Sequence, residues 1–421
     1  MFRHASAIAA ALLSMAAPLM AADALEHALE VTYDWSGIYI GLGTGAGGLV
    51  HEVGIPLFDT SFNGIGAEGL LGEFTVGYDH MLSERMLLGA YGTARLGGVK
   101  SGLSALGGTL TGDITADYGF DLIARAGYLV RPETLVYVLG GYSYQHFELS
   151  SNVGFSDDWE SNGFTAGFGL ETALSDRLSL KGEYRYSQYA AFDLVSLGGI
   201  DVESEPSSHT FHVGLNYRFG VGAPAAASQS SGPSTVSWTG LYVTGSAGGS
   251  SLVHELGIPL FDTWLNGIGG EGVSGSFGVG YDHEFSNGFV AGIQADIRFA
   301  STATTLDVAG LVDGSIDAHY GYDIIGRIGY KPVASTLVYA LGGWTRQDFE
   351  IGSELTGSLY DWSANGLTVG AGIETAVTES IFVGAEYRYS VYETEDVASA
   401  GILEIDPSSH TVSATLKYKF N

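Results

Sequence analysis

Apolar and polar residues alternate with a period of two along most of this chain. The clearest case is the segment 118–128, YGFDLIARAGY, in which every even position carries an aromatic or aliphatic residue. Such alternation is typical of a β-strand with one apolar and one polar face, because successive side chains of a strand point to opposite sides. Eight such segments, each about 10–14 residues long, follow one another between Trp35 and Gly220. The pattern restarts at Trp238, so the sequence predicts an all-β protein.

The connections between these segments differ in length. Tight turns are expected at 82–85, 131–133 and 175–177, and long connections rich in Gly, Ser and Asp at 48–67, 98–113, 150–160 and 191–207. Short turns on one rim and long loops on the other are the layout of a β-barrel in an outer membrane, with the short turns on the periplasmic side. The apolar face of each strand is then predicted to contact lipid, and the polar face to line the lumen.

The chain also contains two copies of one sequence. Residues 51–69 (HEVGIPLFDTSFNGIGAEG) and residues 254–272 (HELGIPLFDTWLNGIGGEG) differ at 4 of 19 positions, so 15 are identical. A solenoid repeat recurs every ~20–50 residues, whereas these copies lie 254 − 51 = 203 residues apart. The repeat is therefore a whole domain that has been duplicated.

Two eight-stranded barrels are predicted rather than one barrel of sixteen strands, which stays the alternative. Each copy has its own aromatic ending, YRF at 217–219 and YKF at 418–420. The segment 221–235, VGAPAAASQSSGPST, has the Ala/Ser/Pro composition of a linker. We expect the first barrel to occupy 35–220, a periplasmic linker 221–235, and the second barrel 236–421.

Charged residues of both signs occupy the strand positions that are predicted to face the lumen. In a narrow lumen such groups are expected to pair, because an isolated buried charge is unfavourable. The predicted ionic network comprises Asp121, Arg125, Glu171, Lys181, Glu183, Arg185, Asp323, Arg327, Glu374, Glu386 and Arg388, with Arg218 in the same phase. Eight strands leave a bore that side chains can fill, which favours a structural core over a gated pore.

Composition and the N-terminus place the chain outside the cytoplasm. Arg3 and His4 precede an apolar, Ala-rich run, which predicts a secretory signal peptide over 1–22, followed by a mature N-terminal segment over 23–34. Cysteine is absent, so no disulfides hold an exported fold. The net charge of −30, with 17 Lys and Arg, argues against nucleic acid as a partner.

The start WSGIYIGLGTGAGG, the eight strands per copy, the YxF endings and the signal peptide resemble the small OmpA-like outer-membrane β-barrels. The closest branch is that of alphaproteobacterial outer-membrane surface antigens, or immunogenic proteins, often labelled a porin family. This resemblance implies an outer-membrane location and assembly through periplasmic chaperones and the barrel-assembly machinery. It also implies that Phe219 and Phe420 belong to the assembly signal, although Asn421 follows Phe420 and the tandem arrangement departs from single-barrel relatives.

The repeated segment is the strongest candidate for a binding site. Its possible ligands for haem or a divalent metal are His51, Glu52, Asp59 and Glu68, with His254, Glu255, Asp262 and Glu271. Adjacent His and Glu point to opposite faces of a strand, however, which is unfavourable for one metal. We therefore assign no confident metal and no cofactor, and also expect a structured loop in which residues 55–58 pack over the barrel mouth and Asn63-Gly64 turns the chain.

No catalytic motif emerges. HEVGI and HELGI lack the second histidine of the H-E-x-x-H zinc proteases. Ser208-His209 and Ser409-His410 are adjacent in sequence, so their side chains point apart on a strand. The sequence thus predicts a non-enzymatic outer-membrane protein with a structural and surface-interaction role. The alternatives are a diffusion porin and a surface receptor for haem or metal. The acidic loops are expected to meet lipopolysaccharide through bridging divalent cations.

Overall fold

The computed structural model describes residues 33–197, 200–219, 236–308, 312–353, 356–398 and 403–420. Within them the chain is almost wholly β-strand, with two short 3-10 turns. The first copy contains β1 (Gly37–Ile55), η1 (Pro56–Phe58), β2 (Thr60–Met81), β3 (Met86–Ala105), β4 (Leu110–Arg131), β5 (Thr134–Ser151), β6 (Ser156–Ala173), β7 (Leu178–Tyr189), β8 (Phe192–Leu197) and β9 (Ile200–Arg218). The second copy contains β10 (Gly240–Ile258), η2 (Pro259–Phe261), β11 (Thr263–Glu284), β12 (Phe289–Val308), β13 (Val312–Val333), β14 (Thr336–Ser353), β15 (Gly357–Ala376), β16 (Ile381–Tyr392), β17 (Glu395–Ala398) and β18 (Leu403–Lys419).

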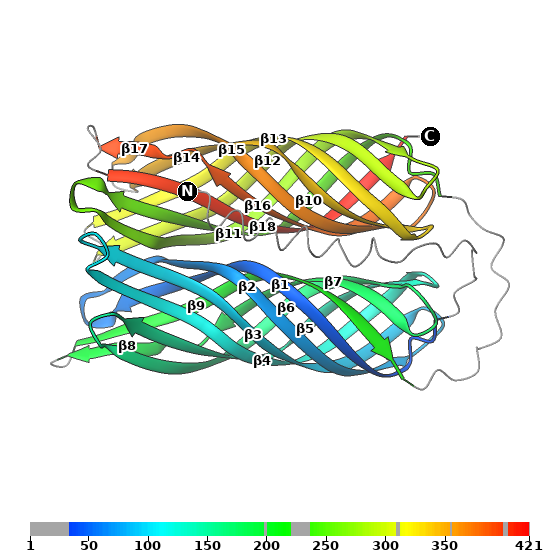
Figure 1. Cartoon of the computed structure of the whole chain (residues 1–421), viewed down its shortest axis with the longest axis horizontal. Helices are drawn as coiled ribbons and strands as arrows, with labels where there is room; N and C mark the ends of the chain where they lie inside the picture. The colour runs from blue at the N-terminus through cyan, green and yellow to red at the C-terminus, as the bar shows by residue number, and fades with distance from the viewer. Residues whose placement is uncertain are drawn as a thin grey trace.

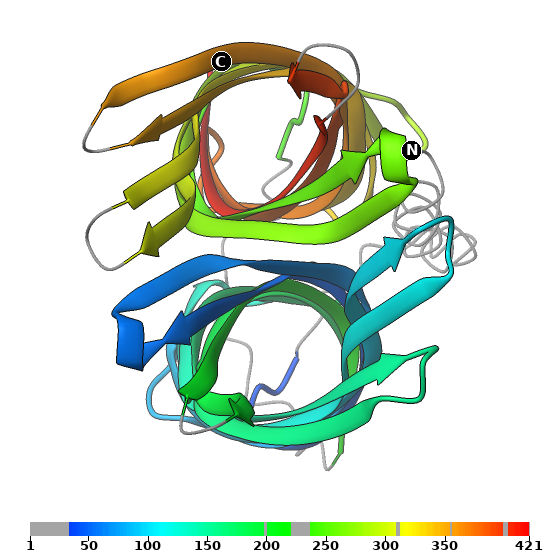
Figure 2. The ribbon, with the colours of Figure 1, turned by 90° about the vertical axis from the view of Figure 1, so that its left-hand side faces the viewer.

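Each copy closes on itself as an antiparallel barrel. In the first, β1 pairs with β2 on one side and with β9 on the other, from Tyr39↔Arg218 to Gly54↔Glu203. In the second, β10 pairs with β11 and with β18 in the same way. Both β7 and β8 lie along β9, so they occupy one position in the ring, and each barrel has eight strand positions. The end-on view shows the two rings side by side (Figure 2).

The outer and inner faces follow the alternation of the sequence. On β4, Leu122 is 65% exposed, whereas its neighbours Asp121 and Ile123 are buried inside the barrel. Large apolar side chains form an exposed band around both barrels, as a lipid-facing surface requires. Among the described residues, none of the helices is long and apolar enough to span a membrane.

The strands are longer than the sequence pattern predicted. The segment 48–67, expected to be a loop, is mostly strand, because β1 runs to Ile55 and β2 begins at Thr60. The chain turns at Pro56–Asp59, not at Asn63-Gly64, which lie within β2. Gly and Ser weaken an isolated strand, but here continuous pairing with β2 and β9 carries β1 well beyond the apolar band. The extracellular parts are therefore extended hairpins.

The two barrels lie side by side with nearly parallel axes, and their short turns share one end (Figure 1). Short pairings between β2 and β11, β2 and β12, and β3 and β11 join the copies, so all strands belong to one continuous sheet network. The predicted signal peptide (1–22), most of the segment 23–34 and the predicted linker (221–235) lie outside the described residues.

Candidate functional site

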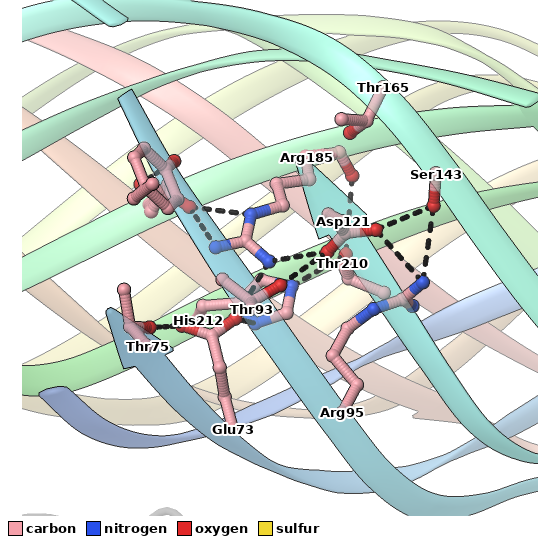
Figure 3. Close-up of polar contacts among 12 residues, drawn as sticks. Glu73, Thr75, Thr93, Arg95, Asp121, Ser143, Thr165, Arg185, Thr210 and His212 are labelled. Atoms are coloured by element: carbon pink, nitrogen blue, oxygen red, sulfur yellow. Dashed lines mark hydrogen bonds and ion pairs between the residues drawn. The ribbon is translucent and has the colours of Figure 1, made fainter. Parts of the chain in front are cut away.

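The lumen of the first barrel is crossed by a buried ionic network (Figure 3). Arg185 lies at its centre and contacts Glu73 at 2.7 Å, Asp121 at 3.1 Å and Glu183. Asp121 also pairs with Arg95 at 3.1 Å. These groups come from β2, β3, β4 and β7, so the network ties together strands that lie on opposite sides of the bore.

A second part of this network lies nearer the short turns. Arg125 binds Asp79 and donates to Glu171 at 2.7 Å. Arg218 binds the same Asp79 at 2.8 Å. The guanidinium of Arg125 also lies 4.9 Å from the ring centre of Tyr137, a distance typical of a cation–π contact. Asp121 and Arg125, close in sequence, thus take different partners.

The lumen of the second barrel has the same plan with other residues. Arg388 contacts Asp296 at 2.8 Å and both Asp323 and Glu386 at 2.7 Å. Asp323 also pairs with Arg298. Arg327 binds Asp282 and Glu374. Lys417 contacts the same two carboxylates. The position of Lys181, which pairs with Glu73 at 2.8 Å in the first barrel, is Gly384 in the second.

Each lumen is electrically balanced. The buried charges of the first are Glu73, Asp79, Asp121, Glu171 and Glu183 against Arg95, Arg125, Lys181, Arg185 and Arg218. Those of the second are Asp282, Asp296, Asp323, Glu374 and Glu386 against Arg298, Arg327, Arg388, Lys417 and Lys419. Five carboxylates thus face five cations in each bore. Pairing with matched hydrogen bonds is what makes buried charges tolerable.

Every residue of the predicted ionic network lies in one of the two lumens. The prediction omitted several members, namely Glu73, Asp79, Arg95, Asp282, Asp296, Arg298, Lys417 and Lys419. A signal for them was present, because they stand in the inward phase of their strands. Extending the alternation through the second copy would have found the last five.

Aromatic layers close the bore above and below the charges. At the end with the short turns, Trp35 and Tyr33 enter the first barrel and pack with Tyr137, while Trp238 occupies the same place in the second. At the extracellular end, Phe147 lies within a buried cluster in the first barrel, and its counterpart Phe349 does so in the second. Each lumen is therefore a stack of an aromatic plug, an ionic layer and an aromatic cap.

Two small cavities lie within the lumens. One beside Arg95 and Tyr189 in the first barrel has a volume of about 30 Å³, and one between Arg298 and Thr411 in the second about 20 Å³. A space of about 10–15 Å³ on this measure is enough to hold one water molecule. Each of these cavities therefore has room for at least one water.

The structure does not bring the candidate ligands of the repeated segment together. His51 points inward beneath the extracellular cap, Glu52 points outward, and Asp59 lies at the hairpin tip. His254, Glu255 and Asp262 are placed in the same way. Within the described ranges no group of three or more His, Asp or Glu residues could hold a metal. The expected packing of residues 55–58 over the barrel mouth was wrong, because Leu57 and Phe58 are exposed at the tip.

The two inward histidines of this segment are buried near the extracellular ends of their strands. His51 lies 55 − 51 = 4 residues before the end of β1, and His254 lies 258 − 254 = 4 residues before the end of β10. His51 Nδ1 lies 3.0 Å from Ser204 Oγ, whereas neither ring nitrogen of His254 has a hydrogen-bond partner. Burial lowers the pKa of both histidines to about 4, so both are neutral at pH 7.

This burial predicts a loss of stability in mild acid. The unfolded chain binds a proton at each histidine as the pH falls through about 6.5, but the folded chain does so only near 4, so the loss occurs between these values. It reaches about 3 kcal/mol per histidine. His254→Leu should reduce the difference between urea unfolding in vesicles at pH 7 and at pH 4.5. The exposed His283→Leu should leave that difference at the wild-type value, and an equal effect of both variants would refute the assignment.

The adjacent Ser and His residues form no catalytic pair. His209 Nδ1 lies 2.7 Å from the Tyr184 hydroxyl on the outer face of the barrel, while Ser208 lines the lumen cavity on the other face. His410 Nδ1 lies 2.7 Å from the Tyr387 hydroxyl in the same arrangement. Both histidines are buried, and neither lies at a rim open to solvent.

The predicted assembly residues lie at the ends of the closing strands. Phe219 N donates to Ile38 O, and Phe420 N donates to Leu241 O, both at 2.9 Å. Their rings are 44% and 51% exposed on the outer surface. Their role in assembly stays a prediction.

Comparison with known proteins gives the same picture of two copies. Residues 7–219 and residues 220–420 each match the family described as outer membrane protein beta-barrel domain. The 31 kDa outer-membrane immunogenic protein of Brucella melitensis is 30% identical over 207 residues, covering 45% of this chain and 85% of the relative. The 25 kDa outer-membrane immunogenic protein of the same organism is 28% identical over 221 residues, covering 50% and 96%. The 22 kDa outer membrane protein of Rhizobium leguminosarum bv. viciae is 28% identical over 165 residues, covering 38% and 67%.

Proposed function

Because the chain belongs to the outer membrane protein beta-barrel domain family, once in each half, we propose that it serves the envelope as a non-conducting structural and surface protein. It is an outer-membrane β-barrel protein whose relatives are outer-membrane immunogenic proteins. The observation that carries the proposal is the filling of both lumens by balanced ionic networks between aromatic layers. A non-enzymatic role is part of the same proposal.

The filled bore favours this role over that of a diffusion porin. A porin needs a continuous aqueous path, which sixteen or more strands supply and eight do not. In the first barrel Arg185 and Arg125 contact carboxylates on facing walls, so ions would have to displace several buried pairs to pass. No observation among the described residues specifically favours the porin or the haem receptor.

Planar-bilayer recording tests the proposal. The purified protein should insert without producing stable single-channel steps, because the charged layer and both aromatic layers would have to open together. The variant Arg185→Ala/Arg388→Ala is the positive control. It removes the central cation of each bore and is the variant expected to conduct. If the wild type conducts with large, reproducible steps, the structural role is wrong and the porin alternative stands.

The surface part of the proposal rests on the extracellular hairpins. Their exposed acidic residues include Asp157, Asp158, Glu160, Asp201 and Glu205. Because ten of the 17 Lys and Arg residues lie inside the lumens, few cations are left to balance this surface. Lipopolysaccharide phosphates bridged through divalent cations are the partner that this charge would accept. Assembly by periplasmic chaperones and the barrel-assembly machinery belongs to the same proposal.

A further inference from the structure

Three contacts between the barrels join equivalent positions of the two copies. Ile65 pairs with Ile268 in the strand register. Gly66 faces Gly269 so closely that a Cβ on Gly66 would lie 2.9 Å from Cα of Gly269, and the reverse distance is 2.6 Å. Gly48 contacts Ser251. In each case the two numbers differ by 203, the spacing of the repeat. A residue touches its own equivalent only where a two-fold axis passes, so these contacts mark such an axis.

The strand pairings away from this axis are reciprocal, as an isologous interface requires. Phe62 of β2 pairs with Leu306 of β12, and the equivalent Leu265 of β11 pairs with Leu103 of β3. Ser61 with Asp307 and Trp264 with Ser104 repeat this exchange. Each repeated segment therefore adds backbone hydrogen bonds to strands of the other barrel.

Two reciprocal triads of Glu, His and Tyr connect the barrels; hydrogen bonds link all three members of the first, whereas in the second the Glu–His contact is an ion-pair distance. Glu68 of the first barrel accepts from His410 of the second at 3.0 Å, and His410 contacts Tyr387. Glu271 of the second barrel lies 3.4 Å from His209 of the first, and His209 contacts Tyr184. Ser408 and Ser207 donate to Glu68 and Glu271 respectively. Separation of the barrels would break both sets of contacts.

The interface continues toward the short turns. Phe211 and Tyr387 stack with ring centres 6.1 Å apart, inside an apolar cluster drawn from both copies. Lower still, Thr172 contacts Thr336 at 3.2 Å, and the reciprocal pair Thr375 and Thr134 lies at 3.5 Å. The barrels thus contact each other along much of their height.

We propose that the repeated segment, 51–69 and 254–272, is a self-recognition element whose partner is its own second copy. It binds the two barrels into one body about a pseudo-two-fold axis, independently of the covalent link. Self-complementarity accounts for the near-identity of the two segments, because each must fit the surface that the other presents. The inference does not rest on the proposed function: whether the lumens conduct has no bearing on it.

Cleavage of the link tests the proposal on the full chain. A protease site placed within residues 221–235 and an affinity tag on the second half allow co-purification in mild detergent after digestion. The wild-type halves should co-purify in equal amounts. Gly66→Val/Gly269→Val should reduce the recovered first half at least ~tenfold, a change that corresponds to about 1.4 kcal/mol. Valine at these positions would collide with the opposite backbone.

The matched control is Gly98→Val/Gly314→Val, because a Cβ at either glycine meets nothing within 4 Å. This variant should co-purify like the wild type. Heat-modifiable gel mobility of each half reports whether both barrels are folded. Wild-type halves that fold but separate after cleavage would overturn the proposal, as would a Gly66/Gly269 variant that co-purifies like the wild type.

A cross-link covers the case in which the valine variants fail to fold. The chain has no cysteine, so Ile65→Cys/Ile268→Cys introduces a unique pair. Directly opposite residues of an antiparallel pair have Cβ atoms about 4.5–5.5 Å apart, within reach of a disulfide after a small adjustment. In oxidised outer membranes the cleaved halves should stay joined on a non-reducing gel. The cleaved halves of the control Gly98→Cys/Gly314→Cys should separate on the same gel. If the halves of both variants separate to the same extent, the proposed interface is contradicted.

Discussion

Replacing Arg125 by methionine should destabilise the first barrel by about 3–5 kcal/mol, because removing one partner of a buried ion pair leaves an uncompensated charge. Arg125 is 2% exposed and holds both Asp79 and Glu171. Asp79 keeps Arg218, but Glu171 is left with hydrogen bonds from Ser179 and Asn216 only. Urea unfolding in lipid vesicles, followed by gel mobility, measures the change.

Two variants make this result interpretable. Arg346→Met removes an exposed guanidinium 3.8 Å from Asp348 and should change the free energy of unfolding by less than about 1 kcal/mol. Arg125→Met/Glu171→Gln removes the stranded charge as well and should recover part of the loss. If Arg125→Met unfolds at the same urea concentration as Arg346→Met, the lumen network does not stabilise the barrel.

Replacing Trp238 by alanine should destabilise the second barrel by about 3–5 kcal/mol, the usual range for deleting a buried tryptophan. Its side chain is 1% exposed and packs against Phe382 with ring centres 4.9 Å apart. Its Nε1 donates to Ala334 O at 3.1 Å, and Lys417 lies over its ring. The variant should also open the periplasmic plug, which amide exchange of β10 and β16 would report.

The control for Trp238→Ala keeps an aromatic ring at this position. Trp238→Phe preserves most of the apolar volume and loses the hydrogen bond, so a smaller loss of about 1–2 kcal/mol is expected. Trp35→Ala should reproduce the large effect in the first barrel, because Trp35 is 2% exposed and donates to Pro132 O. Small effects of both alanine variants would show that the plugs do not contribute to stability.

The lumen side chains and the outer surface of the barrels have different roles. The inside holds five carboxylates and five cations in each bore, so its side chains serve stability. The outer surface carries the groups that a partner can reach, namely the acidic residues of the hairpins and the lipid-facing apolar band. The repeated segment contributes instead to the interface between the two barrels.

The sequence by itself determined the strands, their inward and outward faces, the division into two copies and the aromatic ending of each. These follow from a period of two, which is a local property of an extended chain. It also placed Asp121, Arg185, Asp323 and Arg388 inside, because their phase opposes that of the large apolar residues.

Only the tertiary structure decided which groups pair. Asp121 and Arg125 share a face, but four residues of strand separate them by about 13 Å, so each binds across the bore to other strands. The tertiary structure also decided which outward positions avoid lipid. Glu68 and His209 stand in the same phase as lipid-facing residues, and alternation cannot distinguish them, since only the neighbouring barrel buries them.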